Sequence, residues 1–244
     1  MLDTTKHING KGQRFNSYKV AFGQIPPAAA TALIRLMTIK PLGLKTLPMD
    51  GFSELAQHYM LGQAKYKDIK VEGSPVNIPN WSAGMLMQDM FIESVIRHLN
   101  AYKNGETFDS DFYAHHLRAV AWGFCNLIHM FDNYEVYKQF DDRHWAGCNA
   151  NPVEVFENMV NEELITNQLT VITNFVQCSN NIEQLKYQLS YGIILCLYLI
   201  HKDVFSDDDN DYSQAEFTLN DKVIEKMNDI RETNYGTAKM VSSD

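Results

Sequence analysis

The stretch from Gly84 to Lys103 carries the clearest structural signal in this sequence. Its apolar side chains recur every three or four positions, as on one face of an α-helix, and polar residues such as Asp89 and Asn100 fall outside that face. Gly105 follows closely and can adopt the left-handed conformation that ends many helices. Because such an apolar face must be covered by other elements, the chain is expected to be a packed helical protein. The face comprises Met87, Phe91, Ile92, Val95, Ile96, Leu99 and Tyr102.

The rest of the sequence contains residues that typically begin or end further helices. Pro26-Pro27 and Asn151-Pro152 place proline where the first turn of a helix tolerates it, and Asp50 is a typical N-cap residue. Ser110 or Asp111 can cap another helix after the short acidic loop. The expected helices cover residues 28–40, 50–66, 84–103, 110–131, 153–176, 182–201 and 219–232.

These elements predict an all-α fold, organised as a helical bundle. No internal repeat and no alternation of strand and helix accompanies them, and residues 67–80, with their glycine and prolines, predict a loop or a short hairpin. We expect a flexible N-terminal arm over residues 1–24 and a helical core over residues 25–132. A C-terminal helical extension packed on that core is expected over residues 133–244.

Composition and net charge argue against some classes of function. Hydrophobic residues make up 45% of the chain, which is enough to bury a core. The net charge of -9 argues against general nucleic-acid binding, which needs a basic surface to displace counterions. A nucleotide substrate remains compatible with this charge, because a metal ion can screen its phosphates.

The sequence also predicts a cytoplasmic protein that does not insert into a membrane. The segment Met1–Ser17 lacks the apolar run of a signal peptide, and the longest apolar run, Ile193–Ile200, is far shorter than the roughly 20 residues that cross a bilayer. Cys125 and Cys196 lie in apolar surroundings, which favours buried thiols over disulfides.

Polar side chains gather around the loop that follows the clearest helix. If the helices before and after this short loop are antiparallel neighbours, the loop end brings several carboxylates close to two histidines. Neighbouring carboxylates repel one another, and Mg²⁺, which prefers oxygen ligands, relieves that repulsion and can bridge phosphate oxygens. The residues concerned are His98, Glu106, Asp109, Asp111 and His116, and Lys65 or Arg97 could hold a phosphate oxygen nearby.

Each of these residues also has an ordinary structural explanation. Glu93 and Arg97 are spaced to form an i,i+4 ion pair on a helix surface. Acidic residues in a loop between helices are commonly solvated or serve as helix caps. His98 alone is as readily explained as a hydrogen-bonded structural histidine.

Five short motifs give these residues a more specific meaning. In their order and spacing they resemble the phage and bacterial dATP/dGTP diphosphohydrolase family, which is related to the all-α MazG-like nucleotide pyrophosphohydrolases. The resemblance covers about residues 50–130 and implies a MazG-like core with an additional C-terminal helical region. The motifs are Leu61–Tyr66, Asn80–Gly84, Glu93–Leu99, Gly105–Asp111 and His116-Leu117.

The resemblance implies that a purine deoxynucleoside triphosphate, dATP or dGTP, is hydrolysed to the monophosphate and pyrophosphate. It implies Mg²⁺ as the cofactor, with Mn²⁺ as an alternative, and such helical bundles often bury their surface against a second copy, so a homo-oligomer is expected. If a phage encodes the chain, its location is the host cytoplasm. By motif position, the implied catalytic residues are Glu93, His98, Glu106 and His116, the metal ligands Glu93, Glu106, Asp109 and Asp111, and the substrate-binding residues Lys65, Asn80, Trp81 and Arg97.

Two departures from the family pattern keep a second function open. Ala119 stands where the family usually has a histidine three residues after His116, and Tyr113 and His115 replace a glycine and a proline. The alternative is a catalytically inactive nucleotide-binding or protein-interaction module of a phage. Such a module would be a factor directed at the host or a component of the virion or its assembly.

Overall fold

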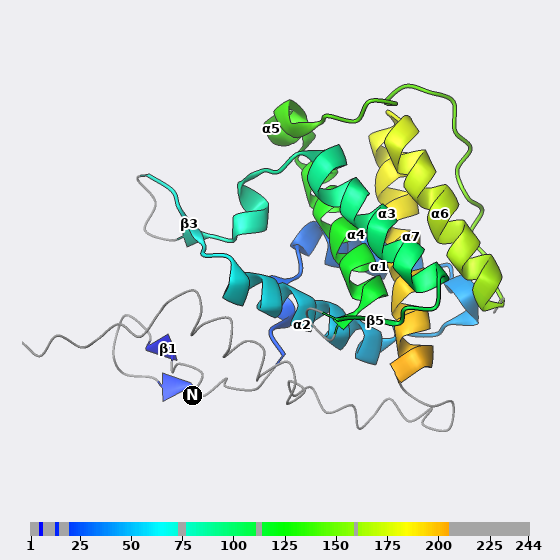
Figure 1. The fold of residues 1–244 in the computed structure, drawn as a ribbon, viewed down its shortest axis with the longest axis horizontal. Helices are drawn as coiled ribbons and strands as arrows, with labels where there is room; N and C mark the ends of the chain where they lie inside the picture. The colour runs from blue at the N-terminus through cyan, green and yellow to red at the C-terminus, as the bar shows by residue number, and fades with distance from the viewer. Residues whose placement is uncertain are drawn as a thin grey trace, which may run out of the picture.

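A computed structural model describes residues 5–6, 13–14, 20–72, 77–110, 114–158 and 161–204. These residues form an all-α helical bundle, which confirms the predicted fold class (Figure 1). None of the helices in these residues is both long and apolar enough to cross a membrane. The helices are α1 (Pro27–Met37), α2 (Met49–Lys65), α3 (Glu93–Lys103), α4 (His116–Asp132), the short α5 (Tyr134–Tyr137), α6 (Glu162–Cys178) and α7 (Ile182–Val204).

Helices α4 and α7 form the centre of the bundle. They pack against each other, both contact α1 and α2, and α3 and α6 close the remaining sides (Figure 1). Both central helices bury side chains on nearly all their faces, as expected for helices with apolar residues all round. The apolar run Ile193–Ile200 therefore belongs to the core of the bundle, where all but the half-buried Tyr198 are fully buried.

A glycine sets the distance between α2 and α7. A Cβ atom added to Gly51 would lie 2.5 Å from the backbone oxygen of Leu197, closer than real side chains come. The two backbones can therefore touch only because position 51 has no side chain. Gly62, further along α2, has nothing within 4 Å of the same virtual atom, so it makes no such close approach.

Besides the helices, the described residues contain short pairs of antiparallel strands. One joins β1 (Thr5–Lys6) to β2 (Gln13–Arg14), and another joins β3 (Ile69–Lys70) to β4 (Asn77–Ile78), in agreement with the hairpin predicted for residues 67–80. The third joins β5 (Phe108–Asp109) to β6 (Ala114–His115), between α3 and α4.

This β5–β6 hairpin corrects the predicted start of α4. The helix was expected to begin at Ser110 or Asp111, but it begins at His116, because the preceding residues pair as strands. The Nδ1 atom of His115 accepts a hydrogen bond from the backbone N–H of Leu117, so a histidine provides the N-cap. Asp111 itself lies outside the described residues.

Two other predicted helices have different bounds in the structure. The stretch 84–103 contains a π-helical segment, Met87–Ile92, before α3, and Asp142 accepts the N–H of Gln88 at its start. The helix predicted from Val153 begins only at Glu162, where the side chain of Asn161 provides the cap. The Asn151-Pro152 signal was wrong because Val153 instead exchanges two hydrogen bonds with the Gln188 amide of α7.

Two expectations concern residues that the structure largely leaves out. The helix predicted for residues 219–232 lies outside the described residues. Within residues 1–24, the described part consists of the two strands β1 and β2 and the chain from Val20 onward.

Candidate metal and nucleotide site

A cavity of about 440 Å³ opens between α2, α3, α4 and the 3-10 turn Asn80–Ala83. Its lining combines aromatic rings with a group of metal-ligating side chains. The volume falls within the roughly 300–1,000 Å³ of sites that hold small-molecule ligands. The aromatic members are Tyr59, Tyr66, Trp81 and Trp122, and the metal-ligating members include His98, Asp109 and His116.

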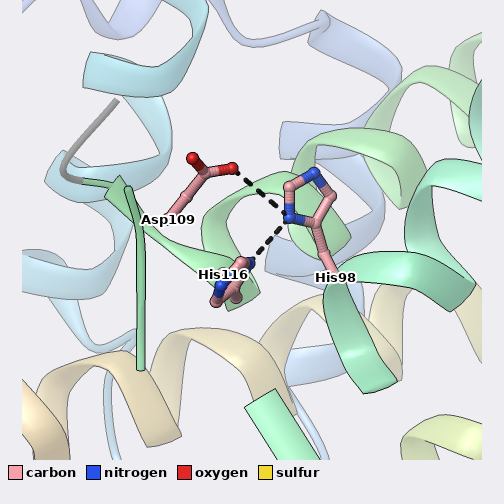
Figure 2. A group of neighbouring side chains, drawn as sticks. All are labelled: His98, Asp109 and His116. Atoms are coloured by element: carbon pink, nitrogen blue, oxygen red, sulfur yellow. Dashed lines mark hydrogen bonds and ion pairs between the residues drawn. The ribbon is translucent and has the colours of Figure 1, made fainter. Parts of the chain in front are cut away.

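His98, Asp109 and His116 converge from three elements (Figure 2). The Nδ1 atoms of the two histidines are 2.8 Å apart, and Oδ2 of Asp109 lies 3.9 Å from Nδ1 of His98. One candidate ligand atom from each residue lies within 4.8 Å of the others. The β5–β6 hairpin produces this arrangement, because its register pairs Asp109 with Ala114 and so returns the chain to His116 beside α3.

Both imidazoles of this cluster are held in the neutral state. Burial, together with the nearby His116 and Arg97, lowers the pKa of His98 to about 4, although Asp109 acts in the opposite direction. Burial also lowers the pKa of His116, against the raising effect of Asp109 and Glu106. Neutral imidazoles keep a lone pair on one nitrogen, which is the form that binds a metal ion.

A second histidine network supports the start of α4. Because Nδ1 of His115 accepts the N–H of Leu117, the ring proton is on Nε2, which donates to Oδ2 of Asp203 at 2.9 Å. The hydroxyl of Tyr102 donates to the same oxygen at 2.7 Å. Burial raises the pKa of Asp203, but the hydrogen bonds from His115 and Tyr102 outweigh it and hold that pKa below its ordinary value. The network fixes the backbone next to His116 from the end of α7.

The other predicted site residues differ in where the structure places them. Lys65, Asn80 and Trp81 line the cavity. Glu106 is not part of the lining, but its side chain, which is 69% exposed, brings Oε2 to 3.9 Å from Nε2 of the lining residue His116. Asp111 lies outside the described residues, so its predicted role as a ligand remains a prediction.

Glu93 and Arg97 do not line the cavity. Ser94 and His98, four residues apart, point into it, whereas the side chains one position earlier are turned about 100° round the helix. Both are exposed: Glu93 accepts a hydrogen bond from Gln88, and Arg97 donates one to Ser94. Among the ion pairs of the described residues there is none between Glu93 and Arg97.

Sequence reasoning missed His58, which also lines the cavity. Burial, with a further contribution from the guanidinium of Arg118, lowers its pKa to about 3. The spacing could have revealed it, since His58, Gly62 and Lys65 follow one another at i, i+4 and i+7 and share one face of α2. Asp203 gave no local signal, because it contacts His115 from 88 residues further along the chain.

A comparison with known protein families finds a match that includes the cluster residues. Residues 38–143 match the family model described as dATP/dGTP diphosphohydrolase, N-terminal. Over these residues the chain is similar to the N-terminal region of this family. All three cluster residues and the aromatic rings of the cavity fall within the matched segment, whereas Asp203 lies beyond it. No curated protein and no solved structure matches the chain significantly.

Proposed function

We propose that the protein hydrolyses purine deoxynucleoside triphosphates, dATP or dGTP, to the monophosphate and pyrophosphate with the help of a divalent metal ion. The observation that carries this proposal is a cavity, lined mostly by residues 38–143, in which the His98–Asp109–His116 cluster meets aromatic rings. A nucleotide needs both kinds of surface, because its base stacks on aromatic rings and its phosphates bind cations.

The aromatic lining offers a place for the base. Trp81 packs edge-on against Tyr59 and His129, which holds its indole in place beside the cavity. Trp122, on α4, packs in a tilted orientation against Tyr59 and Phe91 at another wall of the cavity. Rings fixed by their neighbours lose little freedom when a base stacks on them, so they favour binding.

The polar lining suits the triphosphate. A divalent ion in the cluster would neutralise phosphate charge and lower the pKa of a bound water. Lys65 lines the cavity and can donate to a phosphate oxygen. In this proposal Glu106, whose Oε2 lies 3.9 Å from Nε2 of His116, accepts a proton from the water that attacks the α-phosphorus, as the bond to the β-phosphate breaks and pyrophosphate leaves.

One observation favours a second candidate, a nucleotide-binding module without catalysis. Ala119 lies one turn after His116 on α4, lines the cavity, and occupies the position at which the family usually has a histidine. If that histidine is needed for turnover, the cavity would bind a nucleotide and leave it intact. A homo-oligomer and a location in the cytoplasm, of the host if a phage encodes the chain, remain predictions.

A panel of nucleotides separates the two candidates. Each of dATP, dGTP, dCTP and dTTP is incubated with the full chain and Mg²⁺ or Mn²⁺, and pyrophosphate release and thermal stability are read in the same wells. The proposal expects metal-dependent pyrophosphate release from a purine nucleotide. It also expects Glu106→Gln to slow that release about 100-fold, as for loss of a general base. The matched control is Glu135→Gln, because this exposed glutamate pairs only with Lys138 among the described residues.

The outcomes of this panel are decisive. Pyrophosphate release that is lost in Glu106→Gln and kept in Glu135→Gln supports the enzyme. Stabilisation by a purine nucleotide without turnover supports the inactive binding module. Neither turnover nor stabilisation with any nucleotide contradicts both.

A further inference from the structure

We propose that His98, Asp109 and His116 form a site for a first-row transition-metal ion such as Mn²⁺, and that this site discriminates against Mg²⁺. The role of the ion in the cavity rests on the proposed function, whereas its binding can be measured without any nucleotide. The donor set, the distances and the environment of His116 each support this choice.

The donor set contains two imidazole nitrogens and one carboxylate oxygen. Mg²⁺ favours octahedral oxygen coordination and is usually held by carboxylates, phosphates and water. Imidazole nitrogen suits transition metals, and sites with two histidines and a carboxylate are well known for them. Four carboxylates were expected to hold Mg²⁺. Of the three that the structure describes, Asp109 lies in the cluster, Glu106 lies beside it, and Glu93 is not part of the cavity lining, whereas Asp111 lies outside the described residues.

The distances fit one shared ion. Bonds of about 2.1 Å to nitrogen place two ligands of the same ion roughly 3 to 4 Å apart, depending on the angle between them. The cluster has 2.8 Å between the two Nδ1 atoms and 3.9 Å from Nδ1 of His98 to Asp109. Small side-chain movements therefore suffice for all three to reach one ion. Their side chains are 16%, 22% and 8% exposed for His98, Asp109 and His116, so the cavity gives access to them.

The second nitrogen of His116 also points to a ligand. Its Nε2 atom is buried and has no hydrogen-bond partner among the described residues, while Oε2 of Glu106 lies 3.9 Å away. If Nδ1 binds an ion, the ring proton is on Nε2 and faces that carboxylate. A carboxylate behind a metal-bound histidine is a common outer-shell arrangement, which fixes the tautomer and strengthens the ligand. The otherwise unexplained position of Nε2 is accounted for in this way.

Metal binding alone tests the site. The full chain, stripped of metal, is titrated calorimetrically with Mn²⁺ and, separately, with Mg²⁺, and its Mn²⁺ complex is examined by electron spin-echo spectroscopy for coupling to ¹⁴N. We expect Mn²⁺ to bind at least tenfold more tightly than Mg²⁺ and to show imidazole nitrogen coupling. His98→Asn and His116→Asn should each weaken Mn²⁺ binding at least tenfold.

The control is His144→Asn, because His144 is an exposed histidine away from the cavity lining and reports adventitious binding. Equal affinity for the two metals, absence of ¹⁴N coupling in the wild-type complex, or unchanged Mn²⁺ binding in both histidine variants would overturn the proposal. The coupling is measured on the unaltered chain, so it decides even if a variant fails to fold. Nitrogen-coupled Mn²⁺ without turnover would refute the proposed function alone, and turnover with Mg²⁺ without such coupling would refute the metal site alone.

Discussion

Oδ2 of Asp203 lies 2.9 Å from Nε2 of His115, so the end of α7 holds the residue that precedes His116. Asp203 lies outside residues 38–143, the segment that matches the diphosphohydrolase family model. The cluster in that segment is therefore supported by a helix that the family match does not include. His115 is fully buried at its side chain, so this support acts through a rigid contact.

Replacing Asp203 tests that support. In Asp203→Ala, Nε2 of the buried His115 loses its partner, which should destabilise the protein by about 1–3 kcal/mol. Loss of a direct partner of a metal ligand typically costs 10- to 100-fold in metal affinity. Because Asp203 holds the residue next to the ligand His116 and not the ligand itself, Mn²⁺ binding should weaken by no more than about tenfold. Asp203→Asn keeps an acceptor oxygen, so it should lose less stability and less Mn²⁺ affinity than Asp203→Ala.

Urea unfolding and the Mn²⁺ titration measure the two effects. Asp132→Ala is the control, because this carboxylate pairs with Lys186 at another part of the bundle. If Asp203→Ala binds Mn²⁺ as tightly as Asp132→Ala does, α7 does not position the cluster.

The two glycines of α2 should respond to alanine in opposite directions. Gly51→Ala forces a Cβ against the backbone oxygen of Leu197, so α2 and α7 must separate, which should destabilise the fold by about 1–3 kcal/mol. In Gly62→Ala the added methyl group has no other atom within 4 Å. The change should raise the free energy of unfolding by up to about 1 kcal/mol, because alanine favours the helical conformation more than glycine does.

Chemical denaturation of both variants checks this difference. A Gly51→Ala protein as stable as the wild type would show that the close approach of α2 and α7 contributes nothing. Since both changes add one methyl group to the same helix, general effects of the substitution cancel between them.

Local periodicity was enough to predict much of the fold. The regular apolar spacing in residues 84–103 predicted the helix α3, because burial of one face leaves a repeating pattern. It failed at residues 153–161, where proline and asparagine mimic a helix start. There the amide of Gln188, 35 residues away, holds the backbone in an extended form, and such a distant partner leaves no local pattern.

The candidate site was also predicted only in part from the sequence. The short loop between two expected helices predicted that His98, Asp109 and His116 lie close together, and the β5–β6 hairpin brings them together. The family motifs also assigned Glu93 and Arg97 to the site, but a difference of one position on α3 turns a side chain away from the cavity. Whether a residue faces a site depends on helix rotation, which is fixed by packing rather than by the motif.

His58 should make stability depend on pH. In the unfolded chain His58 binds a proton below its ordinary pKa of 6.5, whereas in the folded protein burial and Arg118 lower the pKa to about 3. The unfolded state therefore gains protons as pH falls from 6.5 toward 3, and the folded state loses stability over that window. The contribution of His58 between pH 7 and pH 5 is about 2 kcal/mol.

Urea unfolding at pH 7 and pH 5 tests this contribution. His58→Gln has no titrating ring and should lose less stability between the two values than the wild type does. His144→Gln, which changes an exposed histidine, should keep the wild-type dependence. Equal pH dependence in all three proteins would show that His58 is not buried in its neutral form.

Trp81 should contribute to nucleotide binding through its indole face. Stacking of a base on an aromatic side chain is worth about 1–3 kcal/mol, which corresponds to roughly 5- to 150-fold in the dissociation constant. Trp81→Leu should therefore weaken binding of an α,β-methylene analogue of dATP by at least about fivefold, since the cavity wall loses its ring. The matched control is Trp145→Leu, because Trp145 is 61% exposed and lies outside the cavity lining.

Calorimetric titration of both variants gives the two dissociation constants, and a thermal melt shows whether loss of the contacts with Tyr59 and His129 has destabilised the fold. If Trp81→Leu melts like the control and binds the analogue equally well, the base does not stack on Trp81, and Trp122 becomes the remaining indole in the cavity on which it can.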